Sequence, residues 1–118
     1  MTGMSRPRTS SRPAAPVAAG HPVEPVPGLD DLADVILSLE TPDEVRRFLR
    51  DLCTLPELEA LAHRWQIARL VDDGVPYLEI ARRVPSSTAT VTRVAQWLRH
   101  GSGGYRLALD RDTTRRRA

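Results

Sequence analysis

Residues 76–98 read PYLEIARRVPSSTATVTRVAQWL, the most informative stretch of this sequence. Its spacing predicts two short helices joined by a tight turn, because apolar residues recur where they would close such a pair: Ile80, Ala81, Val84, Val91 and Val94. Ser86 or Ser87 can cap the second helix. The pattern is typical of a helix-turn-helix, in which the second helix enters the DNA major groove and its N-terminal residues meet base edges.

The candidate DNA-contacting residues are the polar and small ones on or beside these two helices. Small hydroxyls can donate to phosphates, touch bases or pack on thymine methyl groups. Arginines at the end of the first helix suit phosphate contacts. The candidate set is Arg82, Arg83, Ser87, Thr88, Ala89, Thr90, Thr92, Arg93 and Gln96.

Each candidate also has a structural alternative. Arg93 could pair with an acid on a neighbouring helix, and Arg82 and Arg83 could complement a helix dipole. Three threonines within a turn and a half are modest helix formers, so we interpret them as groove-contacting residues. Gln96 could bind adenine, although it comes late in the helix. The two tryptophans, Trp65 and Trp97, are interpreted as core residues because they lie among apolar ones.

Polar segments flank the part of the chain that can fold. Residues 1–27 hold six of the ten prolines and almost no large apolar residue, which predicts a disordered tail that carries arginines. This tail lacks the apolar core of a signal peptide, and no run approaches the roughly 20 residues that span a bilayer. Residues 110–118 are expected to form a second, basic tail. The folding part is then 28–109, which is small for an independent monomer.

Charge is unevenly distributed, although the formal net charge is only +2. Residues 28–73 hold five arginines and eleven acidic residues, whereas residues 74–118 hold nine arginines and three acidic residues. The basic part contains the candidate DNA-reading helices. A concentration of positive charge in one part of the chain favours binding to the negatively charged phosphates of DNA.

Further helices are predicted on both sides of the helix-turn-helix. Residues 29–40 have apolar residues at helical spacing. Thr41 and Glu44 form a capping-box signal around Pro42, which starts a second helix. A final helical turn or two is expected over 105–109. No convincing strand is found, so we predict an all-α fold of about six helices.

The third helix, from Leu55 to about Asp73, is apolar over an unusually wide arc. A helix of this kind must be surrounded by other elements, and a domain of about 80 residues has few. A second copy of the chain would resolve this, and a two-fold dimer would also match a two-fold DNA site. The arc comprises Leu58, Leu61, Ala62, Trp65, Ile67, Ala68, Leu70 and Val71.

The sequence shows none of the usual signs of an enzyme or a metalloprotein. It has one cysteine, Cys53, and three scattered histidines without metal-ligand spacing. We find no nucleophile–base set, no paired carboxylates and no phosphate-binding glycine loop. We therefore expect no enzymatic activity, no metal and no cofactor. A free thiol is compatible with the reducing cytoplasm, where we expect the protein to act.

From about residue 29 to 109 the chain resembles the Trp repressor family, and more closely its YerC/YecD branch. The resemblance implies an intertwined all-helical homodimer in which residues 77–84 and 87–99 form the DNA-reading head. Three stretches carry it: LPELEALAHRWQIARLVDDG at 55–74, YLEIARRVPSSTATVTRVAQWL at 77–98, and HGSGGYRLAL at 100–109, which is distinctive of the branch.

The resemblance also bears on a small-molecule effector. In the Trp repressor, tryptophan lies between the long central helix and the recognition helix, framed by two arginines that match Arg64 and Arg93 here. The repressor has glycine after the second arginine, which leaves room for the indole, whereas this chain has Val94. We therefore expect no tryptophan co-repressor, and leave open whether another effector binds. Arg64 could instead form a structural ion pair.

The leading hypothesis is a sequence-specific transcriptional regulator, a repressor, that binds double-stranded DNA as a homodimer. Its affinity for DNA should depend on salt. The alternative is a helical dimeric protein-interaction module that docks on another regulator or on a polymerase subunit. That alternative needs no clustered hydroxyls on the recognition helix and predicts no salt-sensitive affinity for DNA.

Overall fold

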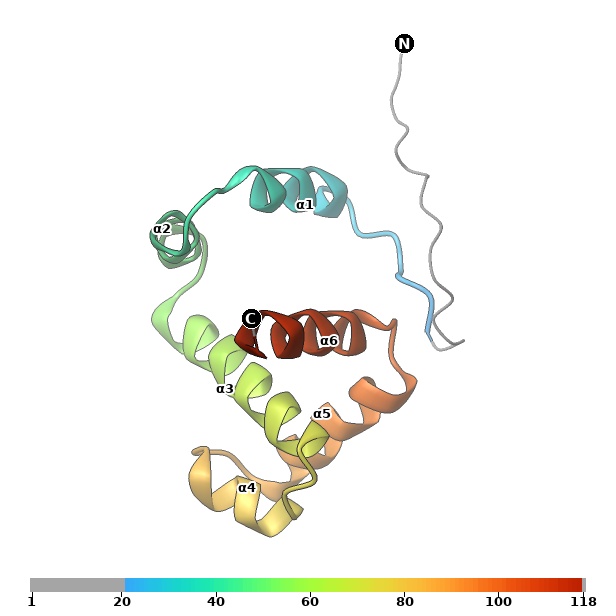
Figure 1. Cartoon of the computed structure of the whole chain (residues 1–118). Coiled ribbons are helices and arrows are strands. Elements are labelled where there is room, and N and C mark those ends of the chain that lie inside the picture. Colours follow the sequence, from blue (N-terminus) through green and yellow to red (C-terminus); the bar gives the residue numbers. More distant parts are fainter. Residues whose placement is uncertain (1–20, 118) are drawn as a thin grey trace. The chain divides into compact units, whose positions relative to one another are not determined.

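The computed structural model describes residues 21–117, which form six α-helices and no strand (Figure 1). The predicted all-α fold is therefore confirmed. Most of the predicted N-terminal tail lies outside the described residues, and residues 21–25 have no regular secondary structure. The helices are α1 (Leu29–Ser38), α2 (Pro42–Leu52), α3 (Leu55–Asp72), α4 (Tyr77–Arg83), α5 (Thr88–His100) and α6 (Gly104–Arg117).

Two compact units divide the described chain. The first, residues 23–95, contains α1 to α4 and the start of α5, and the second contains residues 21–22 and 96–117. Within the first unit α4 packs on α3, and the buried residues belong to α3, the helix-turn-helix and the start of α5. These residues are Ile67, Ala68, Ile80, Val84, Val91, Val94 and Ala95. The apolar positions expected to close α4 on α5 are thus buried, apart from the half-buried Ala81.

Threonine caps set the starts of α2 and α3. The Thr41 hydroxyl accepts from the Glu44 backbone N–H at 3.1 Å, but the Glu44 carboxylate accepts from Glu40 N–H at 2.8 Å, so only half of the predicted box forms. The complete box is at α3, where Thr54 N–H donates to Glu57 Oε1 at 2.8 Å and Glu57 N–H donates to Thr54 Oγ1 at 3.3 Å. These bonds satisfy backbone donors that a helix start leaves free.

The α3 capping box should make the stability of the protein depend on pH. The hydrogen bond from the Thr54 backbone N–H, with help from the Thr54 side chain, lowers the pKa of Glu57 below its ordinary value of 4.5. Since the folded pKa is depressed, this stabilisation is present above pH 4.5 and is lost as the pH falls through the folded value. We expect Glu57→Gln to lower the urea midpoint at pH 7, and the gap from wild type to shrink on acidification. A gap that stays constant down to pH 3 would contradict this reading.

Many apolar side chains of α1, α2 and the first half of α3 remain accessible in the single chain. No residue of α1 or α2 is buried. Only part of the wide apolar arc predicted for α3 is buried in the single chain. Ile67 and Ala68 are buried, whereas Leu61 and Ala62 are exposed. Trp65, predicted as a core residue, is half-buried. The exposed large apolar residues of this region are Leu29, Val35, Ile36, Leu37, Leu52, Leu55 and Leu61.

Helix α6 extends beyond the turn or two predicted from the sequence. Residues 110–117, expected as a polar tail, continue the helix. Ion pairs at helical spacing support the extension, since Arg106 Nη2 lies 2.9 Å from Asp110 and Arg116 Nε lies 3.0 Å from Asp112. Leu109 is the buried apolar residue of this helix.

Candidate nucleic-acid interface

The turn between α4 and α5 is held by its two serines. Ser87 caps α5, because its hydroxyl oxygen accepts from Thr90 N–H at 3.1 Å. Ser86 donates its hydroxyl to the Val84 carbonyl at 3.2 Å. The sequence allowed either serine to be the N-cap of α5, and in the structure the N-cap is Ser87. The caps fix where α5 begins and therefore which of its side chains face outward.

Helix α5 has one buried face and one exposed polar face. Val91, Val94 and Ala95 are buried. The exposed residues include two pairs four positions apart, which places the members of each pair on the same side of the helix. These pairs are Thr88 with Thr92 and Ala89 with Arg93. The chain therefore presents the candidate contact residues to solvent at the N-terminal half of α5.

Three of the predicted contact residues differ from the rest: Ser87 and Thr90 take part in the cap of α5, and Gln96 lies outside the N-terminal half of the helix. Thr90 is half-buried, and its hydroxyl lies 3.1 Å from that of Ser87, so it takes part in the cap of α5. Gln96 is exposed, follows Thr92 by four residues and belongs to the second compact unit. The structure thus concentrates the exposed candidates of α5 at Thr88, Ala89, Thr92 and Arg93.

The three candidate arginines of α4 and α5 differ in whether they form an ion pair. Arg83 Nε lies 3.0 Å from Glu79 Oε2, four residues earlier on α4, which supports the structural alternative for Arg83. Both side chains are partly exposed, and such a pair contributes little stability, so a phosphate can compete for the arginine. Arg82 and Arg93 are exposed and have no ion-pair partner within the described residues. The ion pair considered for Arg93 is therefore not seen in this part of the chain.

The resemblance predicts three residues that match the ligand slot of the Trp repressor, and the structure places two of them at the surface and one in the interior. Arg64 on α3 and Arg93 on α5 are exposed, and Arg64 has no ion-pair partner in the range 21–117. Val94 is only 4% exposed. Its side chain fills interior space that a glycine would leave empty. None of Arg64, Arg93 and Val94 lines the hollow of about 290 Å³ in this unit. Its lining residues are Gln66, Arg69, Leu70, Asp73, Arg83 and Val84.

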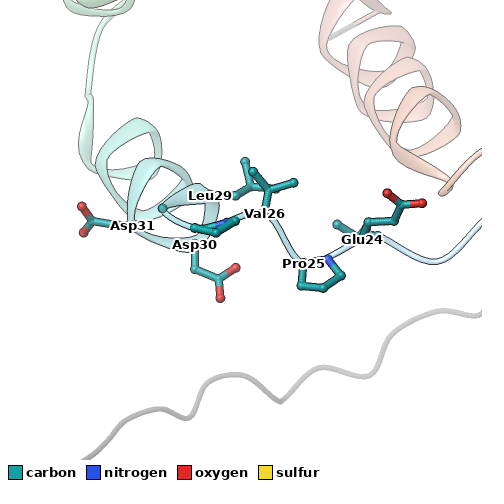
Figure 2. A pocket seen from close by; sticks show the side chains of 9 residues that line it. Glu24, Pro25, Val26, Leu29, Asp30 and Asp31 are labelled. Carbon is teal, nitrogen blue, oxygen red and sulfur yellow. The ribbon is translucent and has the colours of Figure 1, made fainter.

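A second hollow lies along the segment that leads into α1. It has a volume of about 730 Å³ and is lined by residues 23–31 (Figure 2). The carboxylates of Glu24, Asp30 and Asp31 point in different directions and do not converge on a common point. Across the described residues, no group of three or more potential ligands could hold a metal ion. No helix of this range is long and apolar enough to cross a membrane.

One contact at the C-terminal end of α5 was missed by sequence reasoning. Trp97, predicted as a core residue, is 46% exposed, and the His21 ring stacks on it. These residues are 76 positions apart in the sequence, and no local pattern links them. The core prediction for Trp97 is therefore wrong for the single chain, in which the residue stays accessible even with the His21 ring against it.

The family model, the curated relative and the solved structures that match this chain all point to the same family. The family described as Trp repressor protein matches residues 27–113. The uncharacterised protein YerC of Bacillus subtilis is 43% identical over 83 residues, which are 70% of this chain and 80% of YerC. A candidate Trp repressor from Staphylococcus aureus, solved by crystallography, is 40% identical with a TM-score of 0.69, covering 73% of this chain and 86% of that one. A TrpR-like protein from Eubacterium eligens is 35% identical with the same TM-score, covering 73% and 89%.

Proposed function

Because this chain belongs to the Trp repressor protein family, we propose that it is a sequence-specific transcriptional regulator that binds DNA as a homodimer. The observation that carries the proposal is the exposed polar face of α5. Thr88, Thr92 and Arg93 lie on a helix whose other face is buried, so the helix is held rigidly while these side chains remain available. A rigid, outward-facing helix is what major-groove recognition requires.

The chemistry of each exposed residue suits a particular kind of contact with DNA. The Arg93 guanidinium is shaped for bidentate bonds to guanine O6 and N7, and threonine can bond to bases or pack its methyl group on thymine. Arg82, which has no ion-pair partner among the described residues, suits a phosphate beside the groove. Arg83 can join it by exchanging Glu79 for phosphate. The excess of arginine over acids in residues 74–118 favours such contacts.

The accessible apolar residues of α1 to α3 support the homodimer. A single chain leaves Val35, Ile36 and Leu61 substantially exposed, although they lie on the apolar stripes that the sequence places toward a core. Exposed patches of this kind mark interaction surfaces. A second copy would bury them and would present two α5 helices to two half-sites of one duplex.

We further propose that tryptophan is not the co-repressor. Val94 is buried on α5 directly after Arg93, at the position where the Trp repressor has the glycine that leaves room for the indole. We infer that the valine side chain fills the corresponding space. Isothermal titration with L-tryptophan should therefore give no heat of binding at millimolar concentration. Val94→Gly serves as the comparison. It costs about 1 kcal/mol in helix propensity and about 1.5–3 kcal/mol more in lost burial, so circular dichroism must first show that the variant is folded. Micromolar binding to the wild-type chain would overturn this assignment.

Selection of duplexes from a random library, at a stated salt concentration, tests the proposed function. We expect enrichment of a two-fold symmetric site, called the selected duplex below, whose binding weakens steeply with added salt. The repressor assignment is then tested by placing the site upstream of a reporter. The alternative, a dimeric protein-interaction module, predicts no enriched site and no salt-sensitive DNA binding, and a pull-down after nuclease treatment would then identify its protein partner.

A further inference from the structure

Thr90 lies on the side of α5 that faces the interior of its compact unit. Each residue of an α-helix is turned by about 100° from the one before it, so Thr90 is turned by about 200° from both Thr88 and Thr92. Those two threonines are exposed, whereas Thr90 is half-buried. Val94, one helical turn after Thr90, is 4% exposed. Of the three threonines at the start of α5, Thr90 is therefore the one turned away from the exposed polar face.

The Thr90 hydroxyl contacts the side chain that caps α5. Its oxygen lies 3.1 Å from the Ser87 hydroxyl oxygen, and either group can be the donor. The same Ser87 oxygen accepts from the Thr90 backbone N–H at 3.1 Å. Ser87 thus has two hydrogen bonds to one residue, and together they hold its side chain in the orientation that caps the helix. Without the Thr90 hydroxyl only one of these bonds remains, and the Ser87 side chain gains freedom to change rotamer.

Buried residues anchor the turn on both sides of Ser87. Ser86 donates its hydroxyl to the Val84 carbonyl at 3.2 Å, and Val84 is 3% exposed at the end of α4. On the other side, the Val91 N–H donates to the Ser87 carbonyl at 3.2 Å, and Val91 is fully buried. Both ends of the turn are therefore fixed by packing. The geometry of the first turn of α5, which carries Thr88, then depends on the cap between them.

We propose that Thr90 is a positioning residue of the recognition helix, whose hydroxyl holds Ser87 in the capping orientation and so sets the first turn of α5 against the DNA bases. This inference rests on the proposed function. Thr90 itself contacts no DNA. Base contacts from Thr88 and Arg93 need side chains placed to within about 0.5 Å, whereas phosphate contacts carry no sequence information. Loss of the Thr90 hydroxyl should therefore reduce discrimination between sequences more than overall affinity for DNA.

Thr90→Val in the full chain tests this directly. Valine has the shape of threonine and the same branching at Cβ, so the change removes the hydroxyl and little else. Binding to the selected duplex should weaken about 10-fold, whereas binding to a scrambled duplex of the same length should change less than about twofold. Thr90→Ser keeps the hydroxyl and should restore binding to the selected duplex. A serine variant as weak as the valine variant, or equal losses on both duplexes, would overturn the proposal.

A double-mutant cycle with Ser87→Ala separates positioning from direct contact. Since Thr90 acts through Ser87, Thr90→Val should cost less than about twofold once residue 87 is alanine. Thr92→Val is the matched control, because exposed Thr92 is a proposed direct contact. It should weaken binding by the same factor with serine or alanine at position 87. An equal effect of Thr90→Val in both backgrounds would mean that Thr90 contacts DNA itself. Circular dichroism shows that each variant is folded.

The free protein gives a test that needs no DNA. The Thr90 N–H donates to Ser87, which protects this amide from hydrogen exchange. By NMR, Thr90→Val should lower the protection factor of the amide at position 90 several-fold, and Thr90→Ser should keep it near the wild-type value. An unchanged protection factor in Thr90→Val would overturn the effect of the hydroxyl on the cap. A wild-type chain that shows this effect but binds no duplex would instead overturn the proposed function, and with it the effect on site selection.

Discussion

Replacing Arg93 with alanine should weaken binding to the selected duplex about 10- to 100-fold per half-site. Arg93 is exposed on the outward face of α5 and has no ion-pair partner within the described residues, so its guanidinium is available for a base or a phosphate. A bidentate contact to guanine is worth about 1–3 kcal/mol. The homodimer loses two such contacts. Fluorescence anisotropy with a labelled duplex gives the affinity, and circular dichroism shows whether the fold is kept.

Arg47→Ala is the matched control for this measurement. The Arg47 side chain is 73% exposed on α2 and pairs with Asp43 at 3.2 Å, so the change removes the same charge outside the head. We expect an effect below about twofold, because an exposed pair contributes little to stability and a distant charge is screened. Equal losses in the two variants would mean that Arg93 acts only through net charge. No loss in either would contradict the assignment of α5 as the recognition helix.

Replacing Ile36 with aspartate should dissociate the proposed dimer. Ile36 lies on the apolar stripe of α1 and is 42% exposed in the single chain. Burying an isoleucine side chain stabilises by about 1.5–3 kcal/mol, and an unpaired carboxylate in its place adds a desolvation penalty of several kcal/mol. Since each dimer contains the change twice, the dimer dissociation constant should rise at least ~1000-fold. Sedimentation equilibrium measures it directly.

The neighbouring Leu37 supplies the control. It is 84% exposed and lies off the stripe, so Leu37→Asp introduces the same carboxylate on the opposite side of α1. We expect this variant to remain dimeric and to bind the selected duplex. The Ile36 variant should lose DNA binding along with dimerisation, because a monomer presents only one α5. A wild-type chain that sediments as a monomer while still binding a two-fold site tightly would contradict the dimer.

The parts of the fold that could be predicted are those set by residues close together in the sequence. The helix-turn-helix follows from apolar spacing, and Ile80, Val84, Val91 and Val94 are all buried as that spacing indicates. Gly74 follows α3 with a φ of +84°, which is the left-handed conformation that ends many helices. Caps, breaks and periodicity act within a few residues of one another, so they can be read directly from a sequence.

Other features depend on polar contacts, or on contacts between distant segments, which composition and apolar periodicity do not report. The extension of α6 is supported by i, i+4 ion pairs such as Arg106 with Asp110, in a segment that looks like a polar tail by composition. Trp97 stays 46% exposed even though the His21 ring, 76 residues away in the sequence, stacks on it. Thr90 is half-buried, and its hydroxyl is 3.1 Å from that of Ser87, a polar contact within one helical turn. Periodicity alone does not determine any of these three.

Methylation interference on the selected duplex tests most directly whether the outward face of α5 reads DNA. Methyl groups on guanine N7 project into the major groove, whereas those on adenine N3 project into the minor groove. We expect guanine methylation to block binding in two half-sites about one helical turn apart, and Arg93→Ala to abolish the block at one guanine in each. Interference confined to adenines, or an unchanged guanine pattern in the Arg93 variant, would contradict a major-groove role for this helix.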